Sequence, residues 1–324
     1  MSEPSIQTTD LSKSIGWWKP QILVDKLNLT VGAGQVFGLL GPNGAGKTTT
    51  FKMLLGLARI SSGGAFLFGR PVPAPASRQQ VGFLPEVVNH PDILTPREYL
   101  GFHGRLMEVA DLNNRITQLL RDFAVEDAAD RPLGQCSKGM RQRVDLARVL
   151  LAEARLILLD EPVSGLDPLG QHLLKELILR LKGQGISILL TSHAVGMLAE
   201  VCDAVGILHR GQMAVQGPLT QLLAAVKTKI RFRRPSEAVT IQAPTNVTVT
   251  CTEAREVEWV APSGPEVPAA VATIVRAGGE ILEVVPLAET LLQLFSRVIH
   301  EREGPHKESR GAPHDGASGS GGVQ

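Results

Sequence analysis

Apolar and polar residues alternate along the first part of the chain in the way that half-buried β-strands do. This period of two covers residues 5–11 and 22–31, after which a Gly-Ala-Gly turn leads into a short apolar run at residues 36–40. Further runs with strand character follow at residues 63–69, 80–84, 155–160, 186–191, 204–208 and 212–216. The last two lie on either side of Arg210-Gly211 and predict a hairpin.

Segments with helical character separate these strands. Thr95 is a favourable cap for a helix whose first position is Pro96, and a mostly helical region continues to about residue 124. The other helices predicted between the strands cover residues 49–55, 140–153 and 168–182, the last one ended by Gly183. Because strands and helices alternate repeatedly, we expect an α/β domain with a largely parallel sheet.

The pattern changes beyond about residue 225. Short strand-like pieces and two helices follow, at residues 230–233, 247–250, 257–260, 267–277, 280–285 and 287–300. We interpret residues 1–225 as one domain and residues 226–300 as a separate, small α+β domain. Residues 301–324 are rich in Gly, Ser, His and charge without apolar periodicity, and this composition predicts a disordered tail.

Composition excludes several classes of protein. The chain has 324 residues with 33 basic and 32 acidic side chains, so its net charge of +1 favours no nucleic-acid partner. Cys136, Cys202 and Cys251 are far apart and odd in number, which predicts neither a disulfide framework nor a metal site and fits a reducing compartment. The N-terminus lacks the features of a secretory signal, and the uncharged stretch 183–199 is too short and too interrupted to span a membrane.

The strongest chemical signal follows the apolar run 36–40. It matches the phosphate-loop pattern G-x-x-x-x-G-K-[ST] without a mismatch, between a predicted strand and a predicted helix, in Gly41-Pro42-Asn43-Gly44-Ala45-Gly46-Lys47-Thr48-Thr49. Its glycines let successive N–H groups point at a polyphosphate, and the start of the helix adds its positive dipole end. Lys47 adds a charge at the β- and γ-phosphates, and Thr48 offers a hydroxyl to Mg²⁺.

Two further segments are predicted to end at the same edge of the sheet. Asp160 and Glu161 follow four apolar residues, the Walker B arrangement, in which Asp160 holds Mg²⁺ and Glu161 polarises the attacking water. His193 follows the next strand and is predicted to reach the γ-phosphate, although a histidine alone would more often be structural. Upstream, Trp17 and Trp18 offer a flat face for an adenine ring, and core packing explains them about as well.

Taken in this order, the motifs resemble those of the ATP-binding subunits of ABC (ATP-binding cassette) transporters, over residues 5 to about 225. In that family an LSGGQ-like signature precedes the Walker B strand, and here Cys-Ser-Lys-Gly-Met at residues 136–140 fills its place. Ser137 and Gly139 match the family pattern, while the other positions depart from it. The resemblance implies that Ser137 and Gly139 serve the nucleotide bound by a second subunit, so that two ATP molecules are enclosed between two cassettes.

The resemblance assigns roles to further residues. Ser-Gly-Leu-Asp at residues 164–167 matches the family's D-loop, which places Asp167 near the nucleotide, and His193 matches its switch histidine. Glu86 stands where the family usually has a Gln that touches Mg²⁺ and relays to the membrane subunit. A carboxylate also suits Mg²⁺, but it adds negative charge near Glu161. The family's stacking aromatic corresponds to Trp18 rather than to Trp17.

The implied protein is a P-loop NTPase of the ABC cassette fold: a mostly parallel sheet with an antiparallel β subdomain and a helical subdomain, plus the small C-terminal α+β domain. It would bind ATP and Mg²⁺, form a homodimer, and hydrolyse ATP to drive export through separate permease subunits at the cytoplasmic face of the membrane. The region 95–124 would grip a coupling helix of the permease. The signature, Glu86 and the C-terminal domain resemble the drug- and polysaccharide-exporting ABC-2 type.

The alternative is a soluble ABC ATPase with a regulatory, non-transport role. Ribosome-acting relatives generally carry two cassettes, whereas this sequence has one phosphate loop. DNA-repair relatives split the cassette with long coiled coils, and this sequence contains no such heptad insert. A second alternative is a cassette that binds ATP without turning it over and acts as a regulator; Asp160-Glu161 and His193 argue against it, while Glu86 leaves it open.

Overall fold

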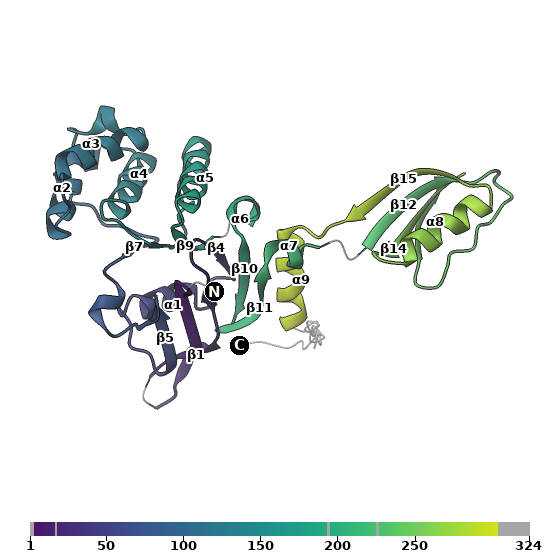
Figure 1. Cartoon of the computed structure of the whole chain (residues 1–324), viewed down its shortest axis with the longest axis horizontal. Helices are drawn as coiled ribbons and strands as arrows, with labels where there is room; N and C mark the ends of the chain where they lie inside the picture. The colour runs from purple at the N-terminus through teal and green to yellow at the C-terminus, as the bar shows by residue number, and fades with distance from the viewer. Residues whose placement is uncertain (1–2, 17, 193–194, 225–226, 254, 304–324) are drawn as a thin grey trace, which may run out of the picture.

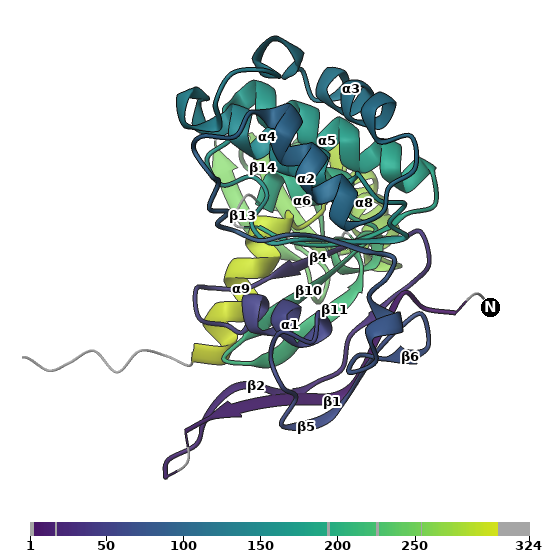
Figure 2. The same ribbon diagram turned by 90° about the vertical axis from the view of Figure 1, so that its left-hand side faces the viewer.

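The computed structural model describes residues 3–16, 18–192, 195–224, 227–253 and 255–303, without the side chains of residues 251–253. Figure 1 shows a larger α/β body and a smaller module that extends away from it. Figure 2, turned by 90°, shows helices on one side of the central sheet and a second, antiparallel sheet on the other side. This is the α/β architecture that the strand and helix pattern predicted.

The central sheet has six strands and is mostly parallel. In spatial order its strands are β11 (Gln212–Pro218), β10 (Ala204–His209), β4 (Val36–Leu40), β9 (Ser187–Thr191), β8 (Leu156–Leu159) and β7 (Val81–Leu84). β11 alone is antiparallel, through the predicted hairpin with β10. Every residue of β4 is buried, because the sheet is covered on both faces. The carboxyl ends of five parallel strands therefore meet at one edge.

The antiparallel sheet packs against the face of the central sheet that lies away from the helices of residues 96–183, with helix α1 (Lys47–Leu54) between the two sheets (Figure 2). Its strands are β2 (Gln21–Leu27), β1 (Ile6–Ile15), β3 (Thr30–Val31), β5 (Ser62–Leu67) and β6 (Arg70–Pro71). Helix α1 buries Phe51, Met53 and Leu54 in the same apolar cluster as residues of both sheets. The two sheets thus hold the start of α1, and with it the phosphate loop, in a fixed place.

Helices cover the opposite face of the central sheet. They are α2 (Pro96–Leu106), α3 (Leu112–Asp122), α4 (Lys138–Val149), α5 (Pro168–Gly183), α6 (Val195–Val201) and the single turn α7 (Leu219–Leu222), with 3-10 turns at Glu126–Ala128 and Leu133–Gln135. A further 3-10 turn, Pro75–Ser77, contacts β6 of the antiparallel sheet instead. The predicted start of α2 is confirmed: the Thr95 hydroxyl accepts from the Glu98 N–H, and the Glu98 carboxylate accepts from the Thr95 N–H. In the described part of the chain, no helix is both long and apolar enough to cross a membrane.

The accessory module, residues 227–287, has its own core. Its antiparallel sheet has the order β13 (Thr248–Glu253), β14 (Glu256–Pro262), β12 (Lys227–Arg233) and β15 (Glu280–Leu287), and helix α8 (Glu266–Arg276) packs on one face. The strand predicted at residues 230–233 is confirmed as part of β12, in which Ile230 and Phe232 are buried on one face. Trp259 on β14 is fully buried and packs edge-on against Phe232, with ring centroids 4.9 Å apart.

We expect Trp259→Ala to unfold the accessory module locally. Large-to-small changes of a fully buried tryptophan cost about 3–5 kcal/mol, so amides of β12 and β14 should exchange with deuterium about 10²–10⁴ times faster. Nucleotide binding should be unchanged, because the module's apolar cluster is separate from those of the body. Val284→Ala, at a side chain of the same module that is 42% exposed, is the control. Unchanged exchange in Trp259→Ala would show that this side chain does not hold the module together.

The last helix belongs to the body of the protein and not to the accessory module. α9 (Leu291–Glu303) was grouped with the small C-terminal domain, but Leu291, Leu294 and Val298 pack in the main apolar cluster of the body. α9 contacts α6, β10 and β11, so the chain leaves the body after α7 and returns to it (Figure 1). The prediction of a disordered tail from Glu301 is also wrong at its start, since α9 continues to Glu303; the rest of that segment lies outside the described residues.

Candidate functional site

The phosphate loop is enclosed by two strands. A Cβ atom at Gly41 would collide with the carbonyl oxygen of Leu208 on β10, and one at Gly46 would lie 2.7 Å from the carbonyl oxygen of Leu23 on β2. Gly46 also has a φ of 107°, a conformation that side chains other than glycine rarely adopt. Only glycines therefore allow the backbone to turn this tightly before α1 begins at Lys47.

Lys47 is held across the mouth of the loop. Its ammonium donates to the carbonyl oxygens of Gly41 at 2.6 Å and Pro42 at 3.4 Å, and it lies 3.8 Å from Oε1 of Glu161. Burial lowers the pKa of Lys47, and the nearby carboxylates of Glu161, Asp160 and Glu86 act in the opposite direction. The loop thus places one buried ammonium where it can meet a phosphate.

Asp160 and Glu161 follow β8 at the carboxyl edge of the sheet, as predicted. The Thr191 hydroxyl, at the end of β9, donates to Oδ1 of Asp160 at 2.8 Å and accepts from the Glu161 N–H at 2.8 Å. This orients the buried Asp160 carboxylate and fixes the turn that places Glu161 near Lys47. From the sequence alone, Thr191 is only the end of a predicted strand. Its role follows from the parallel pairing of Leu159 with Leu190, which brings the next residues of both strands together.

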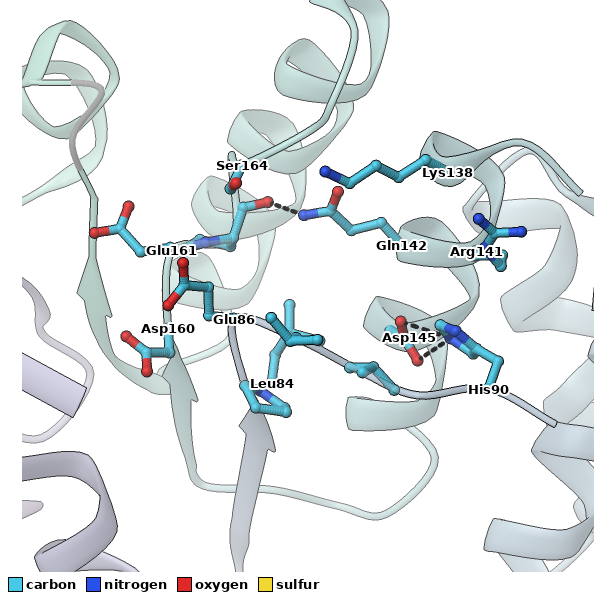
Figure 3. A pocket seen from close by; sticks show the side chains of 14 residues that line it. Leu84, Glu86, His90, Lys138, Arg141, Gln142, Asp145, Asp160, Glu161 and Ser164 are labelled. Atoms are coloured by element: carbon cyan, nitrogen blue, oxygen red, sulfur yellow. Dashed lines mark hydrogen bonds and ion pairs between the residues drawn. The ribbon is translucent and has the colours of Figure 1, made fainter. Parts of the chain in front are cut away.

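Glu86 joins the same site from the loop that follows β7. A cavity of about 250 Å³ is lined by Leu23, Pro42, Asn43, Gly44, Ala45, Gly46, Lys47, Thr48, Thr49, Glu86 and Glu161. A neighbouring cavity of about 310 Å³, shown in Figure 3, is also lined by Glu86 and Glu161, together with Asp160 and Lys138. The carboxylates of Glu86, Asp160 and Glu161 lie at the same end of this second cavity (Figure 3). The structure therefore brings the phosphate loop and all three predicted carboxylates together.

The donor set fits a Mg²⁺ ion that arrives with a nucleotide. Among the described residues, no group of three or more His, Cys, Asp or Glu side chains forms a metal cage by itself. Mg²⁺ is usually bound by one or two carboxylates, waters and substrate phosphates, so such a cage is not required. The Thr48 hydroxyl and the Asp160 and Glu86 carboxylates supply only oxygen ligands, which are the ligands that Mg²⁺ prefers.

The signature segment lies apart from the phosphate loop of its own chain. Ser137 caps α4 by accepting from the Met140 N–H at 3.2 Å, and its side chain is exposed. A Cβ atom at Gly139 would meet open space. Neither residue lines the phosphate-loop cavity. Lys138, which departs from the family pattern, instead lies against Gly165 of the D-loop.

Three predicted residues lie outside the two cavities or outside the described chain. Asp167 accepts from the Gly170 N–H at 2.7 Å and so caps α5, but it lines neither cavity. Trp18 lies in the turn between β1 and β2 and lines neither cavity, whereas Leu23 further along β2 does. His193 lies outside the described residues.

Comparison with known proteins agrees with this geometry. A protein-family model described as "ABC transporter" matches residues 24–164. The chain is 40% identical over 226 residues to an ABC transporter ATP-binding protein of Synechocystis sp., covering 67% of this chain and 64% of the relative. It is 39% identical over 221 residues to the Nod factor export ATP-binding protein I of Sinorhizobium fredii, covering 67% and 63%. The chain thus spans slightly less than two thirds of these two relatives.

A solved structure of the ATP binding subunit of an ABC transporter has the same fold in its matching part. It superposes with a TM-score of 0.62 at 31% sequence identity, and the match covers 67% of this chain and 91% of the solved chain. The matching share of this chain is similar in all three comparisons, at 67%.

Proposed function

Because the chain belongs to the ATP-binding subunits of ABC transporters, a family of ATPases, we propose that it hydrolyses Mg-ATP to drive export through separate membrane subunits. The main support is the position of the charged side chains. Lys47, Glu86 and Glu161 line the phosphate-loop cavity, and Glu86, Asp160 and Glu161 line the neighbouring one. Phosphoryl transfer depends on such a collection of positioned charges more than on covalent chemistry.

Each residue of the site has a separate role in hydrolysis. The backbone N–H groups of residues 43–49 and the Lys47 ammonium bind the phosphates. Thr48, Asp160 and Glu86 would hold Mg²⁺, which would neutralise phosphate charge. Glu161 orients the attacking water toward the γ-phosphate and accepts a proton from it. His193 contacts the γ-phosphate, and Trp18 stacks on the adenine.

The nucleotide site is completed by a second copy of the chain. Ser137 and Gly139 are accessible and do not line their own chain's phosphate-loop cavity, which supports a role opposite the nucleotide of a partner. The exposed start of α4 adds N–H groups that favour an anion. We therefore expect a homodimer that encloses two nucleotides, with Asp167 of each chain near the shared interface.

Export and membrane association have separate support. One relative is named as an export ATP-binding protein, and the ABC relatives act as parts of transporters by name. In this chain an exposed apolar patch on α2, the docking patch, consists of Phe102, Leu106 and Met107. Phe102 and Leu106 are four residues apart and lie on the same face of the helix. An apolar surface of this kind favours a helical segment of a permease, and it would hold the chain at the cytoplasmic face of the membrane.

Leu106→Glu tests this function. Leu106 is 73% exposed, so the charge should not disturb folding, but burying it against a permease would weaken association by about 30-fold or more. Binding is measured by co-purification with any multi-spanning membrane protein found in the neighbouring reading frames, and coupling by the ATPase rate of the complex in proteoliposomes. Hydrolysis by the isolated variant should stay within about twofold of the unmodified chain.

Val275→Asp, an exposed position on α8 of the accessory module, is the matched control and should leave association unchanged. If Leu106→Glu still binds the membrane protein with unchanged affinity, the docking patch does not contact a permease. An active ATPase that binds no membrane protein at all would favour the regulatory, non-transport alternative.

A further inference from the structure

Glu86 is placed by a loop rather than by a regular element. Its side chain is exposed, and it lies in the segment 85–94 between the end of β7 and the cap of α2. A carboxylate in such a loop reaches Asp160 and Glu161 only if the loop is held in one conformation.

A buried pair of side chains holds the loop on the side that follows Glu86. Nε2 of His90 lies 3.0 Å and 2.9 Å from the two carboxylate oxygens of Asp145 on α4 (Figure 3). The two side chains are only 9% and 4% exposed, so this is not a surface ion pair. Because a buried carboxylate is costly without hydrogen-bond donors, Asp145 holds His90 firmly.

Asp145 also connects two further elements. The Tyr99 hydroxyl on α2 donates to Oδ1 of Asp145 at 3.2 Å. Burial and the Asp145 carboxylate raise the pKa of Tyr99, so this hydroxyl stays protonated and available as a donor. Arg148, one turn further along α4, lies 4.0 Å from Asp145 and donates to the carbonyl oxygen of Phe83 at 3.1 Å. The chain is therefore tied to α4 on both sides of Glu86, at Phe83 at the end of β7 and at His90 in the loop.

We propose that His90 and Asp145 are positioning residues for ATP hydrolysis, which hold the loop 85–94 so that Glu86 lies beside Asp160 and Glu161. This inference rests on the proposed function. α4 also carries Ser137 and Lys138 at its start, so the same pair connects the Glu86 loop to the helix that meets the second subunit. His90 and Asp145 line the opposite end of the neighbouring cavity from Asp160 and Glu161 (Figure 3), and neither lines the phosphate-loop cavity, so we expect their effect on hydrolysis to pass through Glu86.

A double-mutant cycle with Glu86→Gln tests the proposal. His90→Phe keeps a ring and removes the nitrogen, and it should lower kcat by about 10–100-fold with the KM for ATP within about twofold. Adding Glu86→Gln should cause little further loss, because both changes remove the same positioned carboxylate. His90→Gln, which retains an N–H donor, should recover most of the rate. His172→Ala, at a side chain that is 62% exposed on α5, is the control and should be neutral.

Effects of His90→Phe and Glu86→Gln that multiply independently would overturn the proposal, as would a rise in KM with kcat unchanged. If His90→Phe does not fold, Asp145→Asn is used in the same cycle, and the same criteria decide. The controls separate this test from that of the proposed function. An active unmodified chain with independent effects rejects only the positioning role, whereas an unmodified chain without ATP turnover rejects the proposed function and the inference with it.

Discussion

Glu161→Gln is expected to lower the rate of ATP hydrolysis by at least about 100-fold while ATP binding is kept. Glu161 lies at the carboxyl edge of the sheet, 3.8 Å from the Lys47 ammonium, and its carboxylate is the group we propose as the base for the attacking water. The amide has nearly the same shape but accepts a proton poorly. Because ATP then stays bound, dimers should accumulate in the presence of Mg-ATP. The measurements are phosphate release and the molecular mass in solution with and without ATP.

Glu153→Gln is the matched control for this experiment. Glu153 is exposed, lies outside both cavities of the site, and carries the same change of charge. Its hydrolysis rate should equal that of the unmodified chain. Unchanged hydrolysis in Glu161→Gln would reject the role of Glu161 as the base, even if ATP binding is normal.

Lys47→Ala should weaken ATP binding by about 10–100-fold, which is the loss expected when one charge-assisted hydrogen bond is removed. The buried ammonium is fixed by the carbonyl oxygens of Gly41 and Pro42, so it faces the phosphates without having to be ordered by them. The rise in Tm that ATP causes in the unmodified chain should be smaller at the same ATP concentration, because that rise depends on affinity. Isothermal titration and thermal unfolding with ATP measure both effects.

The control for Lys47→Ala lies on the same helix. Lys52 is exposed on α1, and its replacement by Ala removes the same charge without touching the loop. ATP affinity should then be unchanged within about twofold. Equal losses in both variants would mean that the general charge of α1, and not the placed Lys47 ammonium, attracts the nucleotide.

The sequence determined the features that depend on neighbours in the chain. The phosphate loop needs glycines and a lysine at fixed spacing, and the structure confirms that Pro42–Thr49 line one cavity. The Thr95 cap, the buried strand before Asp160 and the hairpin at Arg210-Gly211 are likewise local patterns. Each could be predicted because hydrogen bonding and burial over a few residues are encoded in residue type and period.

Only the tertiary structure decided which distant segments meet. α9 has an apolar stripe that any core would bury, and its placement on the body rather than on the accessory module depends on the path of the whole chain. The contacts of Thr191 with Asp160 and of His90 with Asp145 join residues 31 and 55 positions apart. Such contacts follow from sheet register and helix packing. A single sequence does not display them, because many partners of similar size and polarity would satisfy the same local pattern.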